Sequence, residues 1–226
     1  MRPTSIRFRN RQEAGRRLAH ALERYRDRAN TVVLGLPRGG VVPAAEIASA
    51  LGLPLDIVIA RKIGAPGNPE LAIGAIAEGG EAYINQDTAA MTGATPGFIA
   101  RATEHQREEI RRRQQLYRGG RELTLPKRAT VILVDDGVAT GSTVIAAIPA
   151  INRHRPERVV LAIPVAPPDT AKLLGDMVDE LVVLAVPDPF FAVGEFYDEF
   201  AQVSDEDVCA LLEQGRHSSN QPRSSS

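Results

Sequence analysis

The sequence predicts an α/β protein with a parallel central sheet, helices on its flanks and a small hood built from the two terminal segments. Short apolar runs alternate with segments of helical periodicity, most regularly over 129–186. Strands that alternate with helices form parallel sheets with right-handed crossovers. The 226 residues are enough for one large domain. We expect a single domain over 1–213, with its core at 30–187 and its hood at 1–29 and 188–213, followed by a disordered tail at 214–226.

Four elements are predicted in the first part of the chain. Asn10 followed by Glu13 resembles a capping box, which predicts the start of an amphipathic helix. The apolar run TVVLGL ends at Pro37 and is typical of a buried strand. In chain order we expect a helix over 11–28, a strand over 31–36, a helix opened by Pro43 and closed by Gly52, and a strand over 55–60.

Glycine and proline characterise the next stretch. Residues 61–70 carry two glycines and two prolines, which disfavours regular structure, so we expect a mobile loop there. The segment 71–85 predicts a hairpin that turns at Gly79 and Gly80. Residues 97–118 predict a charged helix with few apolar positions.

The second half of the chain shows the clearest alternation. Pro149 interrupts the pattern of one predicted helix, because proline removes a backbone hydrogen bond and clashes with the carbonyl four residues earlier. We therefore expect a kink or an early helix end at Pro149. The predicted elements are strands over 130–134, 158–164 and 181–186 and helices over 142–152 and 168–175.

Composition excludes several classes of protein. No apolar run approaches the roughly 18 residues that span a bilayer, and the first residues lack the apolar stretch of a secretory signal. Cys209 is the single cysteine, so an internal disulfide and a cysteine-based zinc site are excluded, and we expect a cytoplasmic protein. The four histidines fall in or beside predicted surface helices and in the tail, and do not form a metal site.

Charge is unevenly distributed, although the formal net charge is −1. Residues 1–28 hold nine arginines and three acids, whereas residues 169–213 hold twelve acids and a single lysine. A basic segment can bind a polyanion such as nucleic acid, but solvated helix faces and pairing between subunits explain the pattern more simply. The sequence leaves the oligomeric state open, and a homodimer that pairs the two regions is the arrangement this pattern favours.

The most informative segment is VILVDDGVATGST, residues 131–143. Four apolar residues predict a buried strand, Asp135 and Asp136 stand at its carboxyl end, and a loop of small and hydroxyl residues leads into the next helix. Ligands of open α/β sheets bind at this end of the strands, where helix N-termini offer N–H donors to phosphate. Two carboxylates beside such a cradle favour sugar hydroxyls, a cation, or both. A phosphorylated ribose would use both the acid pair and the phosphate cradle. The Walker and dinucleotide-binding glycine patterns are absent from the sequence.

Residues 131–143 resemble the phosphoribosyl pyrophosphate (PRPP) signature of the type I phosphoribosyltransferases. GLPRGG at 35–40 is similar to the pyrophosphate loop of that family, and Arg61 with Lys62 is similar to the basic pair that opens its catalytic loop. The resemblance covers about residues 30–190. It implies a Rossmann-like parallel sheet and a PRPP-dependent transferase of nucleotide metabolism.

The resemblance also implies a role for each matching residue. Asp135 and Asp136 would hold the ribose hydroxyls, and Arg61 and Lys62 would neutralise pyrophosphate as 61–78 closes as a lid; these four are the implied catalytic residues. Mg²⁺ would be bound by oxygens of PRPP near Asp135 and Asp136, with no direct protein ligand. The 5′-phosphate would lie on Gly137, Val138, Ala139, Thr140, Gly141, Ser142 and Thr143. Pyrophosphate would also meet Arg38, Gly39 and Gly40, after a cis peptide bond between Pro37 and Arg38.

The acceptor site is less well defined. The nucleobase pocket of the family follows the last strand, which implies a stacking role for Phe190 or Phe191, with packing in the hood as the alternative. Ala139 stands where the hypoxanthine-guanine branch has an acid, so the general base is unassigned, and Glu70 and Glu78 are the candidates.

These motifs predict a pentosyltransferase that moves the 5-phosphoribosyl group from PRPP to a nitrogen nucleophile, a nucleobase or similar heterocycle, and releases pyrophosphate. The alternative is a non-catalytic PRPP-sensing regulator that binds nucleic acid, which the arginines at 1–28 and 101–128 motivate. Against it, the sequence has no recognisable DNA-binding motif and retains Arg61 and Lys62, which a sensor would not need. A third function, a PRPP-using domain that works with a partner hydrolase, stays open.

Overall fold

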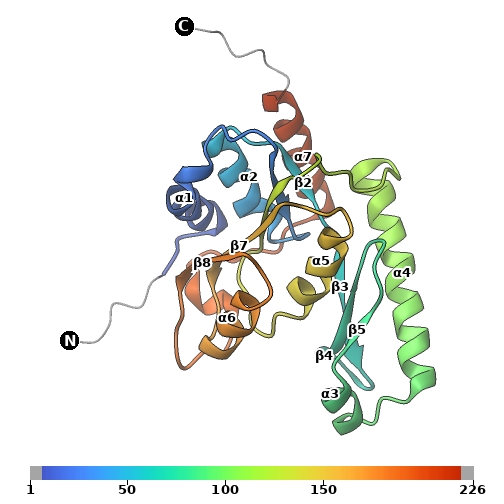
Figure 1. Ribbon diagram of the computed structural model, residues 1–226. Helices are drawn as coiled ribbons and strands as arrows, with labels where there is room; N and C mark the ends of the chain where they lie inside the picture. The colour runs from blue at the N-terminus through green and yellow to red at the C-terminus, as the bar shows by residue number, and fades with distance from the viewer. Residues whose placement is uncertain (1–6, 220–226) are drawn as a thin grey trace, which may run out of the picture. The chain divides into compact units, whose positions relative to one another are not determined.

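The computed structural model of the chain describes residues 7–219 (Figure 1). The chain divides into two compact units, which are described separately. The first unit takes the described residues up to Ile57, Leu125–Thr140 and the residues from Pro156 onward. The second takes Val58–Thr124 and Gly141–Arg155.

The first unit is built on a five-stranded parallel sheet, which confirms the predicted fold class. The sheet order is β2-β1-β6-β7-β8, and every neighbouring pair runs parallel. The central strand is fully apolar and fully buried from Val131 to Val134, and it lies between β1 and β7. The strands are β1 (Thr31–Gly35), β2 (Leu55–Ile57), β6 (Thr130–Val134), β7 (Arg158–Val165) and β8 (Glu180–Ala185).

The described residues of this unit form four helices and two short 3₁₀ turns. The helices are α1 (Arg11–Ala21), α2 (Val41–Leu51), α6 (Pro168–Gly175) and α7 (Asp205–Ser219), and the turns are η1 (Glu23–Tyr25) and η2 (Val193–Phe196). Helix α2 packs on β1 and against α1, α6 packs on β8, and α7 packs on α2 and β2. Gly15 allows α1 and α2 to approach closely, because a Cβ there would lie 2.8 Å from Pro43 Cα.

The two ends of the described chain form the predicted hood on this unit. The Phe8 N–H donates to Phe196 O at 2.8 Å, and the Asp198 N–H donates to Phe8 O at 2.9 Å. Phe8 and Tyr197 are buried side by side in a small apolar cluster. The opposite charges of the two terminal regions meet within a single chain, since Arg7 pairs with Asp198 at 2.5 Å and Arg24 pairs with Glu180.

The second unit contains a three-stranded antiparallel sheet and three helices. Its sheet order is β3-β4-β5, and α4 and α5 pack on β3 and β4. The elements are β3 (Ala60–Ala65), β4 (Asn68–Ala77), β5 (Tyr83–Ile84), α3 (Gln86–Met91), α4 (Pro96–Arg118) and α5 (Ser142–Asn152) (Figure 1). The predicted hairpin turn at Gly79 and Gly80 is confirmed between β4 and β5.

A buried carboxylate holds the base of the β3–β4 hairpin. Glu78 accepts hydrogen bonds from the Ile59 N–H at 2.9 Å and from Gln114 Nε2 at 3.0 Å, and it forms an ion pair with Arg118. The side chains of Glu78 and Arg118 are 5% and 3% exposed. The carboxylate therefore joins the entry to β3, the end of β4 and helix α4.

The prediction of a mobile loop at 61–70 is wrong, because these residues form the hairpin of β3 and β4. Gly67 supplies the turn with a φ of +72°. Gly64 sits at a register shift, where a Cβ would lie 2.6 Å from Pro69 Cα. The glycine and the proline therefore serve a close cross-strand approach, which local composition does not reveal.

The structure corrects three further expectations about helices. Helix α1 ends at Ala21 and a 3₁₀ turn follows, so the helix expected to reach residue 28 is shorter. Helix α5 runs through Pro149 to Asn152, so the early end expected there is wrong; the Arg153 N–H still donates to Pro149 O. Helix α7 continues to Ser219, so the predicted tail is helical from 214 to 219, and 220–226 lie outside the described residues. Among the described helices, none has the length and apolar character that a membrane crossing needs.

Candidate functional site

The tip of β6 carries the two acids at the carboxyl edge of the parallel sheet. Asp135 and Asp136 directly follow Val134, the last residue of the strand. Asp135 Oδ1 accepts the Asp136 N–H at 2.9 Å, which fixes the local turn. Burial raises the pKa of Asp135 well above its ordinary value, and the negative charge of Asp136 raises it further. The pair therefore lies in a protected position, where ionised carboxylates need hydrogen-bond donors.

The GLPRGG segment lies directly against these acids. It follows β1, the neighbour of β6, and the Leu36 N–H donates to Val134 O at 2.9 Å. The peptide bond between Pro37 and Arg38 is cis, as the resemblance implied. A Cβ on Gly39 would overlap Asp136 Oδ2, and a Cβ on Gly40 would lie 2.8 Å from Asp135 Cα. Glycine is needed at both positions, and the two sequence motifs form one surface.

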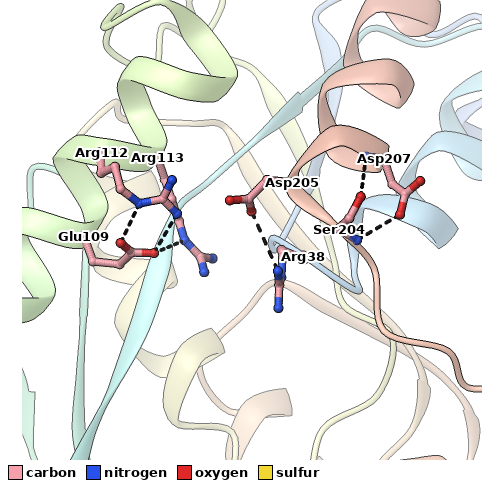
Figure 2. Close-up of polar contacts among 7 residues, drawn as sticks. All are labelled: Arg38, Glu109, Arg112, Arg113, Ser204, Asp205 and Asp207. Atoms are coloured by element: carbon pink, nitrogen blue, oxygen red, sulfur yellow. Dashed lines mark hydrogen bonds and ion pairs between the residues drawn. The ribbon is translucent and has the colours of Figure 1, made fainter.

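Arg38 points toward the start of α7. Its Nη1 lies 3.9 Å from Asp205 Oδ1, and its side chain is 31% exposed (Figure 2). The helix begins with reciprocal hydrogen bonds between Ser204 and Asp207, at 3.0 and 2.9 Å. Sequence reasoning missed α7, although this capping box before an apolar-periodic segment is visible in the sequence.

Sequence reasoning also missed Arg11, the first residue of α1. Its Nε donates to Asp136 Oδ2 at 2.6 Å, and its Nη1 donates to Ala201 O at 2.7 Å. The guanidinium lies over the Phe200 ring, 3.7 Å from the centroid. Burial raises the pKa of Asp136, and the positive charge of Arg11 opposes that rise. No local signal marks Arg11, because its partner lies far along the chain.

The first part of the predicted phosphate loop, residues 137–139, is anchored to the first unit. Gly137 has a φ of +145°, and a Cβ there would overlap Val193. The Val138 N–H donates to Val165 O at 2.9 Å and its side chain is buried, so Val138 holds the loop in place and its amide is already used. Ala139 O accepts the Thr170 hydroxyl at 2.8 Å. The chain then passes to the second unit, where Gly141, with a φ of +76°, precedes α5 and is followed by Ser142 and Thr143.

Arg61 and Lys62 lie on β3 of the second unit. Arg61 Nε donates to Gln106 Oε1 of α4 at 3.0 Å, and Lys62 Nζ lies 2.6 Å from Glu70 Oε2. The hydrogen bond and the charge of Lys62 lower the pKa of Glu70, which makes Glu70 a weaker base. Glu78, the second candidate base, uses its carboxylate on the three donors at the hairpin base.

The two phenylalanines after β8 differ in their surroundings. Phe190 stacks on Phe196, with ring centroids 5.4 Å apart, so it packs within the hood. Phe191 is 76% exposed. The stacking role expected for one of these rings stays a prediction.

The chain belongs to the phosphoribosyl transferase domain family, whose model matches residues 8–199. The family resemblance is thereby confirmed. Two curated relatives from Mycobacterium tuberculosis, strains CDC 1551 / Oshkosh and ATCC 25618 / H37Rv, both carry the name "Putative phosphoribosyl transferase". Each is 42% identical over 206 residues, which is 91% of this chain and 46% of the relative. The chain therefore spans about half the length of these relatives.

A solved structure is also closely similar. The protein TT1426 from Thermus thermophilus is 45% identical, and the two structures align with a TM-score of 0.75. The alignment covers 92% of this chain and 99% of that chain. The fold described above is thus shared along nearly the whole of TT1426.

Proposed function

We propose that the protein is a phosphoribosyltransferase that moves the 5-phosphoribosyl group from PRPP to a nitrogen nucleophile and releases pyrophosphate. The acceptor is a nucleobase or a similar heterocycle. One observation carries the proposal: Gly39 and Gly40 lie against Asp136 and Asp135, so the segment that resembles a pyrophosphate loop contacts the acid pair that resembles a ribose-binding motif. A strand end that was merely solvated would not need glycine at both contacts.

The roles of the residues follow from the charges that the reaction creates. Breaking the bond between C1 and pyrophosphate leaves an electron-poor ribose and a strongly anionic leaving group, and both must be stabilised. We assign Asp135 and Asp136 to the ribose hydroxyls and Arg38 with the Gly39–Gly40 backbone to pyrophosphate. Arg61 and Lys62 are assigned to neutralising the same leaving group.

The 5′-phosphate is assigned to the loop that leads into α5. Its backbone and hydroxyl groups from Ala139 to Thr143 run into the N-terminus of an 11-residue helix, where the helix dipole favours an anion. Val138 contributes by anchoring the loop through Val165 rather than by donating to phosphate.

Mg²⁺ fits this site as a companion of the substrate. Within residues 7–219, no group of three or more His, Cys, Asp or Glu side chains is arranged to hold a metal. Asp136 already uses Oδ2 on Arg11. The ion would be bound by oxygens of PRPP near Asp135 and Asp136, because phosphate oxygens are hard ligands of the kind Mg²⁺ prefers. It would supply positive charge to the leaving group.

The experiment uses the full chain with PRPP, MgCl₂ and a panel of nucleobases and heterocyclic amines. Pyrophosphate release is measured by a coupled assay, and nucleotide products are identified by chromatography. PRPP affinity is measured by calorimetry for the wild type, for Asp135→Asn/Asp136→Asn and for Asp87→Asn, an exposed acid of α3 that serves as the control.

We expect the wild type and the control to bind PRPP equally, and at least one acceptor to yield pyrophosphate and a nucleotide. The double variant should lose binding, because charge-assisted hydrogen bonds are worth about 1.5–3 kcal/mol each. Equal PRPP affinity in the double variant would reject the site, and binding without turnover on any acceptor would reject the transferase.

The regulator hypothesis has no structural observation in its favour. Arginines of the N-terminal region pair with acids of the same chain, among them Arg7 with Asp198 and Arg24 with Glu180. Arg107, Arg111 and Arg112 of α4 likewise pair with glutamates of that helix. This pairing reduces the charge available to a nucleic acid. A homodimer and a cytoplasmic location stay predictions.

A further inference from the structure

One acid of the candidate PRPP site is held by an arginine from outside both sequence motifs. Arg11 Nε lies 2.6 Å from Asp136 Oδ2, and the two side chains are 11% and 15% exposed. A charge-assisted contact of this length between protected groups is stronger than a surface ion pair. Arg11 therefore fixes where the carboxylate of Asp136 lies.

Arg11 is itself held by the hood. Its Nη1 donates to Ala201 O at 2.7 Å, and its guanidinium stacks on Phe200. Phe200 stacks in turn on Tyr197, with centroids 4.9 Å apart. The long arginine side chain is thus fixed at its nitrogen atoms and along its planar face, so its position does not depend on a ligand.

The charges around Asp136 explain why it needs this partner. Asp135 is the adjacent acid, and both residues are half-buried, with 15% of the Asp136 side chain exposed. Two negative groups that are largely shielded from solvent repel each other, and without a cation one of them would take up a proton or turn away. Arg11 supplies the compensating charge from α1.

We propose that Arg11 is a positioning residue for PRPP, which acts through Asp136 by holding its carboxylate ionised and directed for a ribose hydroxyl. The inference rests on the proposed function, because it assumes that Asp136 binds ribose. It adds a residue from the N-terminal helix to a site otherwise assigned to the strand ends and loops. It also makes the hood, through Ala201 and Phe200, a determinant of PRPP affinity.

The test is a double-mutant cycle on PRPP affinity, measured by calorimetry in the presence of MgCl₂. The variants are Arg11→Met, Asp136→Asn and the combination of the two. We expect Arg11→Met to weaken binding about tenfold to hundredfold, the range for a lost hydrogen bond to a charged group. In the Asp136→Asn background the same substitution should change the affinity less than about twofold, because the carboxylate on which Arg11 acts is gone.

Three further variants separate positioning from folding. Arg17→Met is the matched control, since Arg17 lies on the same helix, pairs with Glu13 and also faces an aromatic ring, that of Phe8. It should leave the affinity unchanged. Arg11→Lys should recover part of the loss, and Phe200→Leu, which keeps the ion pair, should cost less than Arg11→Met. If Arg11→Met does not fold, Arg11→Lys takes its place in the cycle.

The outcomes distinguish this inference from the proposed function. Failure of the wild type to bind PRPP would reject both. Binding by the wild type, with Arg11→Met equally harmful in both backgrounds, would overturn the positioning role alone, because a merely structural residue acts independently of Asp136. An affinity unchanged by Arg11→Met in the wild-type background would overturn it as well.

Discussion

The phenol of Tyr197 donates a hydrogen bond of 2.6 Å to the backbone carbonyl of Asp136. The tyrosine is 3% exposed, and its ring packs on Phe8 and Phe200. Burial raises the pKa of this phenol, so it stays a donor across the working pH range. The hood thus holds the main chain of one acid through Tyr197 and its side chain through Arg11.

Replacing Tyr197 by phenylalanine removes that donor and keeps the ring. We expect the free energy of unfolding to fall by about 1–3 kcal/mol, because the carbonyl of Asp136 loses a buried partner. The melting temperature should fall by roughly 2–4 °C for each kcal/mol. Differential scanning calorimetry measures both, with Tyr83→Phe as the control, since Tyr83 is 41% exposed. Equal melting temperatures for the two variants would contradict the assigned role.

Gly137→Ala tests the anchoring of the phosphate loop. The φ of +145° disfavours any side chain, and the new methyl group would overlap Val193. We expect a loss of about 1–3 kcal/mol in the free energy of unfolding, measured by urea titration. Combining the substitution with Val193→Ala should recover a part of the loss, because the overlap is relieved and the backbone strain is not. A fully additive penalty would show that Val193 is not the obstacle.

Glu78→Gln tests the buried ion pair of the second unit. Arg118 would keep its charge in a site that is 3% exposed and would lose its counter-ion. Breaking one partner of such a pair costs about 3–5 kcal/mol, visible as a lower urea midpoint. Glu104→Gln is the control, because Glu104 pairs with Arg107 and Arg111 at the surface and should contribute less than about 1 kcal/mol. A comparable loss in both variants would argue against burial as the cause.

The lowered pKa of Glu109 predicts that stability depends on pH. Hydrogen bonds from Arg112, then from Arg113, lower the pKa of Glu109 from 4.5 to about 2 (Figure 2). Because the folded state holds the proton less tightly than the unfolded state, the stabilisation is complete above pH 4.5 and is lost as the pH falls toward 2. Urea midpoints measured over this range should fall less steeply in Glu109→Gln than in the wild type. Parallel pH profiles would refute the assignment.

Local signals were sufficient where each element is stabilised by its own periodicity and caps. The bounds of β6, α5 and α6 match the prediction, because apolar runs, Gly141 and Pro168 mark them in the sequence. The β3–β4 hairpin escaped prediction because its glycines and prolines satisfy a cross-strand contact rather than a loop. Residue composition shows that glycine and proline are present, but it does not show which strand they contact.

The candidate site was predictable to the same extent. The acid pair and the GLPRGG segment follow from motif patterns, the cis bond after Pro37 follows from the family resemblance, and the structure places them together in the first unit. Arg11, Tyr197 and Asp205 carry no such pattern, because each reaches its partner from a distant part of the chain. Contacts of this kind can be identified only in the folded structure.

The backbone hydrogen bonds between Phe8 and residues 196–198 make these two segments depend on each other for their structure. A protein shortened by its first ten residues would lose the backbone hydrogen bonds between Phe8 and residues 196–198, and the ring of Tyr197 would lose its contact with Phe8. The same dependence applies during synthesis, because this pairing cannot form before residues 196–198 have been made. The main chain of Asp136 therefore reaches its final contacts only after the later segment that carries Tyr197 is available.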